Sequence, residues 1–242
     1  MHDDGYFGPE VAARYDNNER SAPEHVDPVV DLLVALAAGG TALEFAIGTG
    51  RIALPLSRRG VVVEGIELSR AMVARLREKE NGLPIPVTIG DMATTRIQGH
   101  FALVYLVFNT ISNLTTQDAQ VACFENAAAH LAPGGCFVIE TGVPALRTLP
   151  PGKKLRAFSH GNSHWGIDAF DVATQHLTSH HVWLNADGSY DRFAVPFRYA
   201  WPAEFDLMAR LAGLTLENRW SGWKGEPFDS ESESHVSVWR KA

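Results

Sequence analysis

Two glycines, Gly48 and Gly50, stand directly after a short apolar run and directly before a helical pattern. The run at 41–47 is typical of a buried strand, and the pattern from Arg51 onward is typical of a helix with Pro55 in its first turn. Glycine at such a turn adopts backbone angles closed to other residues and lets a ligand approach the main chain. Strand, glycine turn and helix N-terminus together predict a nucleotide-binding site.

Three acidic residues stand where they could serve such a site. Glu67 follows a second apolar run at 61–66, near the spacing at which an acid binds ribose hydroxyls. Glu44 lies inside the first strand. Because burying an acid costs free energy, we expect Glu44 to have a role there, such as organising the turn or reaching the ligand. Asp91 closes a third strand. Because Gly48-x-Gly50-x-x-Ala53 also satisfies the relaxed dinucleotide pattern, a nicotinamide cofactor stays open at this point.

The elements that must position these residues alternate along the chain. Expected strands lie at 41–47, 61–66, 86–89, 101–108 and 136–140, and expected helices at 10–38, 51–59, 69–79 and 115–131. Nearly continuous apolar strands between helices predict an α/β fold, with a parallel sheet covered on both faces.

Beyond Gly142 the pattern changes. Residues 155–200 are richer in histidine and aromatic residues, and Asp187-Gly188 lies between two strand-like runs as a hairpin signal. We therefore expect an antiparallel insertion there. A helix at 202–212 and strands at 214–220 and 235–239 follow. The expected organisation is an N-terminal helical cover (1–40), a cofactor-binding core (41–146), the insertion (147–200), and a C-terminal helix with closing strands (201–242).

Four segments together carry a resemblance to a known family: Glu44 to Gly50, Gly65-Ile66-Glu67-Leu68-Ser69, Gly90-Asp91-Met92 and Leu131-Ala132-Pro133-Gly134-Gly135. The chain resembles class I S-adenosylmethionine-dependent methyltransferases of the small-molecule type, with a β insertion after strand five. The resemblance implies a Rossmann-like seven-stranded sheet, mostly parallel with one antiparallel strand. It implies S-adenosyl-L-methionine as cofactor, S-adenosyl-L-homocysteine as product, and methyl transfer to an O or N atom of a small molecule by in-line displacement.

The resemblance also assigns site residues. Glu67 would bind the ribose, Leu68 and Met92 would enclose the adenine, and Asp91 would bind its amine. Ala46 stands at the family's first glycine position, a mild departure because the next two glycines remain. The full expected cofactor set is Tyr15, Glu44, Ala46, Gly48, Gly50, Arg51, Glu67, Leu68, Met72, Asp91, Met92 and Asn109.

The acceptor side is less defined by the sequence. Strand four ends at Asn109-Thr110-Ile111, without the two prolines of nucleic-acid amino-methyltransferases. Asn109 is expected either to contact the site or to satisfy backbone groups in its loop. The net charge of −7, with no basic run, also argues against nucleic acid as a partner. Expected pocket residues are Tyr6, Asn113 and Trp165.

Adjacent His180 and His181 are candidates for a general base that takes the acceptor's proton. On a strand they would point to opposite faces, so they cannot easily share one ion, and no metal site is expected. Catalytic candidates are thus His180, His181 and Asn109.

Bulk properties restrict the class of protein. The 242 residues are 45% hydrophobic and 20% charged, as in globular proteins, and the two cysteines suggest no disulfide framework. Residues 1–5 show no signal peptide, and no segment reaches the roughly 20 apolar residues of a membrane span. We therefore expect a cytoplasmic protein without a membrane partner, and a homodimer stays open. A nicotinamide-dependent oxidoreductase and a non-catalytic nucleotide-binding protein of the same fold are the alternatives.

Overall fold

The structure is a computed structural model of the whole chain, and it describes residues 5–17 and 21–242. Residues 1–4, on which most of the argument about a signal peptide rested, lie outside the described residues. Residues 18–20, inside the long helix expected at 10–38, lie outside them too.

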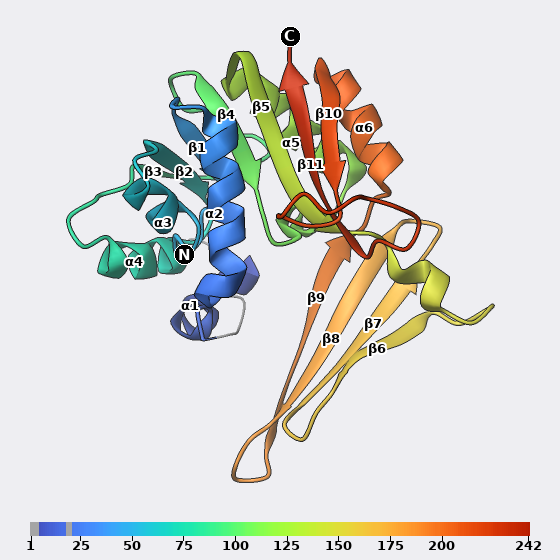
Figure 1. Cartoon of the computed structure of the whole chain (residues 1–242). Helices are drawn as coiled ribbons and strands as arrows, with labels where there is room; N and C mark the ends of the chain where they lie inside the picture. Colours follow the sequence, from blue (N-terminus) through green and yellow to red (C-terminus); the bar gives the residue numbers. More distant parts are fainter. Residues whose placement is uncertain (1–4, 18–20) are drawn as a thin grey trace.

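A seven-stranded sheet forms the centre of the molecule, with the order β10-β11-β5-β4-β1-β2-β3 (Figure 1). β11 pairs antiparallel with both β5 and β10, and the other neighbouring strands pair in parallel. The expected fold class, mostly parallel with one antiparallel strand, is confirmed. The strands are β1 (Ala42–Phe45), β2 (Val63–Glu67), β3 (Val87–Ile89), β4 (Phe101–Leu106), β5 (Leu131–Gly142), β10 (Leu214–Trp220) and β11 (Ser234–Lys241).

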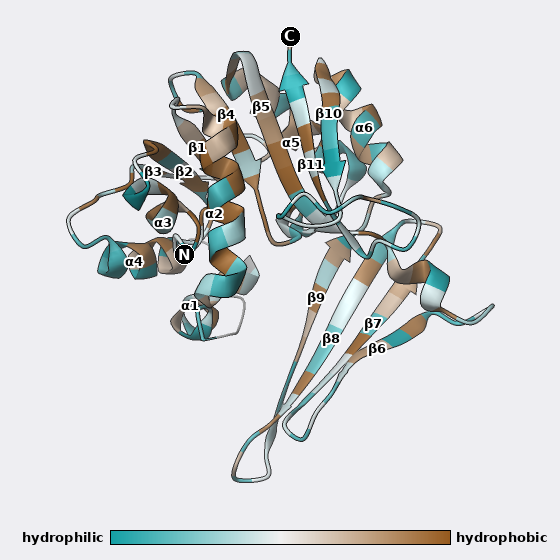
Figure 2. Ribbon diagram, in the orientation of Figure 1, coloured by the Kyte–Doolittle hydropathy of each residue, from teal (hydrophilic) through white to brown (hydrophobic). Residues whose placement is uncertain are grey.

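Helices cover both faces of this sheet. Buried side chains of α2, α3 and α4 belong to the apolar cluster on one face, and those of α5 and α6 to the cluster on the other. In Figure 2 the central strands are mostly apolar, as expected for strands buried on both sides. The helices are α1 (Pro9–Arg14), α2 (Pro23–Ala37), α3 (Ala53–Arg58), α4 (Arg70–Lys79), α5 (Gln117–His130) and α6 (Pro202–Leu211).

The N-terminal helical region differs from the single helix expected at 10–38. Its described part forms two helices, each with proline in its first turn: Pro9 begins α1 and Pro23 begins α2. Proline is favoured in the first helical turn because N–H groups there have no partner within the helix, so the missing N–H of proline costs no hydrogen bond. β5 is longer than the strand expected at 136–140, because it begins at Leu131 and ends at Gly142, and so it includes the expected break at Pro133-Gly134-Gly135. Ser69 caps α4 as expected, accepting from the Met72 N–H.

After β5 the chain passes through a 3-10 turn (η4, Ala145–Thr148) and enters the expected insertion. This is an antiparallel sheet of β6 (Leu155–His160), β7 (His164–Asp171), β8 (His176–Leu184) and β9 (Tyr190–Arg198). Figure 1 shows its strands extending as a long arm away from the central sheet. The hairpin turn at Asp187-Gly188 is confirmed, with Gly188 at φ 85°.

The base of this arm is attached to the core through buried polar contacts. Arg198 forms an ion pair with Glu204 of α6 at 2.7 Å and donates to the side-chain oxygen of Gln120 of α5 at 2.6 Å. Because an unpaired buried guanidinium is costly, these bonds hold the end of β9 against both helices. Among the described residues, no helix is long and apolar enough to cross a membrane.

Candidate cofactor site and acceptor side

The glycine turn connects β1 to α3 at the carboxyl edge of the sheet. Gly48 has φ 57° and lines two adjoining cavities, of about 190 and 30 Å³. Gly50 has φ 75°, and a Cβ there would come within 3.0 Å of the Leu76 side chain. Gly48 therefore presents its backbone to the cavities, whereas Gly50 is required by close packing against α4.

Glu67, at the end of β2, holds this turn in place. Its carboxylate accepts from the Gly48 N–H at 2.7 Å and from the Ser69 N–H at 2.8 Å, and it lines the larger cavity. A carboxylate can accept several hydrogen bonds at once. The side chain is thus buried, oriented by two backbone donors, and placed at the wall of the larger cavity.

One wall of the larger cavity is built from residues that follow β2 and β3. Asp91 is oriented by the Ala93 N–H, which donates to its Oδ1 at 2.7 Å. The cavity thus joins an acid to apolar cover, which suits an amino-purine. The predicted residues that the structure brings together there are Tyr15, Ala46, Gly48, Glu67, Leu68, Met72, Asp91, Met92 and Asn113.

The smaller cavity adds a third acid, Glu44, and a cation, Arg51. Glu44 is 3% exposed, and the Tyr105 hydroxyl donates to it at 2.8 Å. Burial raises the pKa of Glu44 to about 8, and the hydrogen bond from Tyr105 and the nearby Arg51 oppose that shift. The Arg51 guanidinium lies 3.3 Å from the centre of the Phe108 ring. Glu44 and Arg51, side by side in this cavity, could hold a zwitterionic amino-acid group.

The N-terminal segment covers the cavities through contacts that sequence reasoning missed. Phe7 lines the larger cavity, and its carbonyl accepts from the Ser69 hydroxyl at 2.6 Å. Asp16 accepts from the Thr49 hydroxyl at 2.7 Å and pairs with Lys79 at 2.6 Å. An acid in a polar N-terminal segment gives no local signal of such a role.

Asn109 is not brought into either cavity. Its side-chain oxygen accepts from the Thr141 hydroxyl, from the Gly142 N–H at 3.1 Å and from the Ser112 hydroxyl at 3.2 Å. These bonds join the turn after β4 to the end of β5. Of the two expectations, satisfaction of local groups therefore fits the geometry better than a contact with the ligand.

The two adjacent histidines of β8 point to opposite faces of the arm, as their strand register requires. His181 lies across from Gly166 and Phe193 on the face that Tyr6 contacts, where the Tyr6 and Phe193 ring centres are 5.6 Å apart. We call this the inner face. His180 is exposed on the other, outer face.

A chain of hydrogen bonds crosses the inner face. The Ser179 hydroxyl donates to Asp168 at 2.8 Å and lies 3.3 Å from His181 Nε2, and His181 Nδ1 lies 3.0 Å from His164 Nε2. Burial lowers the pKa of both His164 and His181, so both imidazoles are neutral near pH 7. A neutral imidazole can accept a proton, which an imidazolium cannot.

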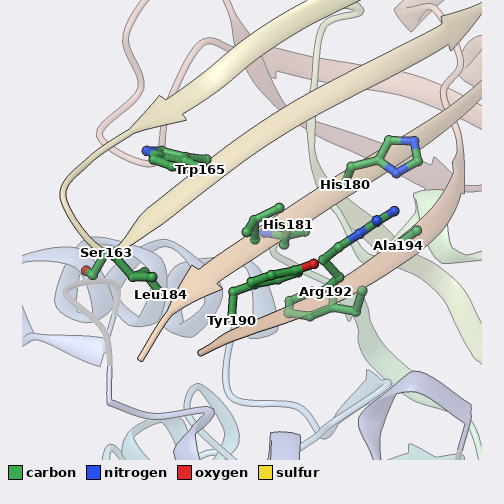
Figure 3. A pocket seen from close by; sticks show the side chains of 10 residues that line it. Ser163, Trp165, His180, His181, Leu184, Tyr190, Arg192 and Ala194 are labelled. Carbon is green, nitrogen blue, oxygen red and sulfur yellow. The ribbon is translucent and has the colours of Figure 1, made fainter. Parts of the chain in front are cut away.

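The outer face carries a groove of about 770 Å³ (Figure 3), which His181 and Phe193 also line. Trp165, 50% exposed, lies there with His180 and Arg192. The structure therefore does not bring Trp165 and His180 to the cofactor cavities, since alternate strand residues face opposite sides. Among the described residues, no group of three or more His, Cys, Asp or Glu side chains could hold a metal ion.

The donor set fits an adenosyl amino acid. The oriented carboxylate of Glu67 could hold a ribose, and Asp91 with its apolar neighbours could hold an adenine. Glu44 and the Arg51 guanidinium could hold an amino-acid end. Sheet order, turn and insertion together define a class I methyltransferase type of protein.

Comparisons with known proteins support this class. A methyltransferase-domain family model matches residues 42–135. The structure of the CcbJ methyltransferase from Streptomyces caelestis is 34% identical, with 99% of each chain covered and a TM-score of 0.88. A cypemycin N-terminal methyltransferase from Streptomyces sp is 26% identical over 83% of this chain and 82% of its own. An N,N-dimethyltransferase of dTDP-3-amino-3,6-dideoxy-alpha-D-glucopyranose from Streptomyces fradiae is 27% identical over 73% and 79%, respectively.

The chain belongs to the S-adenosylmethionine-dependent methyltransferases. Its cofactor is S-adenosyl-L-methionine. The nicotinamide and non-catalytic alternatives are therefore wrong.

Proposed function

We propose that this enzyme methylates an amine nitrogen of a small molecule of the amino-sugar or peptide type. Two relatives support nitrogen as the acceptor atom, because their names specify an N-terminal methyltransferase and an amino-sugar N,N-dimethyltransferase. The net charge of −7 favours such an acceptor over a nucleic acid. A homodimer stays a prediction.

Glu67 is the residue on which the cofactor assignment depends. Its two backbone bonds fix its carboxylate at the end of β2, and in this proposal the carboxylate accepts from both ribose hydroxyls. Leu68, Met72 and Met92 cover the adenine, and Asp91 accepts from its amine. Arg51 binds the carboxylate of the amino-acid end, and Glu44 binds its ammonium.

When bound, S-adenosyl-L-methionine supplies a methyl group on a positively charged sulfur. The chain's own task is to align the acceptor and to take up its proton. Alignment alone can contribute about 7–11 kcal/mol in such a reaction. We assign Tyr6 and Asn113 to the acceptor pocket, and we assign proton uptake to His181 on the inner face.

Calorimetry with S-adenosylhomocysteine tests the cofactor site. We expect the wild-type protein to bind it in the micromolar range, and Glu67→Ala to weaken binding at least tenfold because the ribose bonds are lost. Glu78→Ala is the matched control, since Glu78 is an exposed acid whose ion pair lies within α4. Undiminished binding by Glu67→Ala, or no binding by the wild-type protein, would contradict the proposal.

A further inference from the structure

The turn after β4 holds two consecutive non-glycine residues in the left-handed region. Phe108 has φ 59° and Asn109 has φ 58°. A bulky residue such as Phe is a marked outlier there, because its Cβ crowds the following carbonyl. Such a conformation persists only where the surrounding structure holds it, and it often accompanies a functional site.

The end of β5 supplies that restraint through Glu140. Its carboxylate Oε2 accepts from the Phe108 N–H at 2.9 Å, and its backbone carbonyl accepts from the Asn109 N–H at 3.1 Å. One residue thus binds both N–H groups of the strained pair. Glu140 itself lines neither of the two cofactor cavities.

Phe108 lines the smaller cavity and, together with Glu140, a separate groove of about 560 Å³. The Arg51 guanidinium lies 3.3 Å from the centre of that ring and 5.6 Å from the centre of the Tyr15 ring. All three residues line the cavity together with Glu44. A guanidinium on an aromatic face is attracted to the ring, and this contact fixes the direction in which its N–H groups point.

We propose that Glu140 is a positioning residue for the cofactor's amino-acid end, acting through the Phe108 ring on the Arg51 guanidinium. The inference rests on the proposed function, in which Arg51 binds the carboxylate of that end. Without the Glu140 side chain the turn relaxes, the ring moves, and Arg51 loses its support. The adenosine end, which depends on Glu67 and Asp91, is unaffected.

A pair of ligands separates the two ends of the cofactor. S-adenosylhomocysteine carries the amino-acid end, and 5′-methylthioadenosine lacks it. By calorimetry we expect Glu140→Ala to weaken S-adenosylhomocysteine binding at least tenfold and to change 5′-methylthioadenosine binding less than twofold. We expect Glu140→Gln to restore most of the affinity, because its amide oxygen can still accept from the Phe108 N–H.

A double-variant cycle tests whether Glu140 acts through the ring. Phe108→Gly tolerates the left-handed backbone and removes the ring, so it should reproduce the selective loss. In that background Glu140→Ala should cause no further change in the ratio of the two affinities.

Equal weakening of both ligands by Glu140→Ala, no weakening, or additive effects in the cycle would overturn the inference. If the wild-type protein bound neither ligand, the proposed cofactor site itself would fail. That result is distinct from a failure of the role of Glu140.

Discussion

At the residue scale, the surroundings of Glu44 give it a pKa far from that of an ordinary glutamate. It lies inside β1, and the side chains that face it are Tyr105 from β4, Arg51 from the glycine turn and Glu67 from β2. Burial is the largest influence and raises the pKa of Glu44 to about 8, so the carboxyl is mainly protonated at pH 7. The sequence indicated that an acid inside a buried strand has a role at the turn or at the ligand, but it did not indicate the protonation state of that acid.

This protonation predicts proton release on cofactor binding. An ammonium beside Glu44 favours the carboxylate and lowers its pKa, so the proton held below pH 8 leaves as the ligand binds. Affinity for S-adenosylhomocysteine should therefore rise as the pH rises from 6 to 8. Calorimetry at pH 7 in phosphate and in Tris should show release of close to one proton, and Glu44→Gln should abolish it. Identical heats in the two buffers for the wild-type protein would contradict this prediction.

Ala46 has a backbone conformation that its residue type does not indicate. Its φ is 51°, in the left-handed region where the family's pattern has glycine. An L-residue there costs roughly 1–2 kcal/mol relative to the right-handed form. Alanine is therefore a departure that the turn tolerates with some strain.

At the element scale, β8 assigns two adjacent histidines to different environments. Strand alternation places His181 beside Phe193 and His164 on the inner face, with ring centres 4.7 and 5.2 Å away, and leaves His180 on the outer face. The inner face meets the N-terminal segment through the contact between Tyr6 and Phe193.

The alternation predicts unequal effects of two matched substitutions. With an amino-sugar or peptide amine that the wild-type enzyme methylates, His181→Ala should lower kcat at least tenfold, because a general base typically contributes 10²–10⁴-fold. His180→Ala should change kcat less than twofold. Steady-state rates measured as S-adenosylhomocysteine production provide the comparison, and equal effects of the two substitutions would refute the assignment of His181.

At the scale of the whole molecule, the closing strand β11 buries a histidine in the core. His235 is fully buried between Phe205 and Phe228, with Nδ1 2.8 Å from the Ser237 hydroxyl and no hydrogen-bond partner for Nε2 among the described residues. Burial lowers the pKa of His235 to about 3, and the nearby Arg219 adds to this shift. The folded protein thus excludes a proton that the unfolded chain accepts.

The consequence is a loss of stability in acid. Below about pH 6.5 the unfolded chain binds more protons than the folded one at this position, so the free energy of unfolding decreases as the pH falls toward 3. Between pH 7 and 5 this residue should remove about 2 kcal/mol. In urea unfolding, the decrease in the free energy of unfolding from pH 7 to pH 5 should be smaller by that amount in His235→Phe than in the wild-type protein. The control His160→Gln, which changes an exposed histidine, should show the same decrease as the wild-type protein. An unchanged drop in His235→Phe would contradict the prediction.

Local patterns in the sequence determined most of the fold. The alternation of apolar runs and helical patterns predicted the strands of the central sheet, and Asp187-Gly188 predicted the hairpin of the arm. The resemblance to a known family placed Gly48, Glu67 and Asp91 in one site, and all three line the larger cavity. The strands, helices and turns depend on residue periods, caps and turn residues within a few positions, and the sequence shows these short-range preferences directly.

Only the tertiary structure decided which distant residues support the site. Asp16 meets Thr49 across 33 positions, and Phe108 meets Glu140 across 32 positions. The same packing turned Asn109 toward β5 and placed Trp165 on the outer face. No local propensity specifies these contacts, because they arise from where strand ends and the N-terminal segment come together once the sheet is formed.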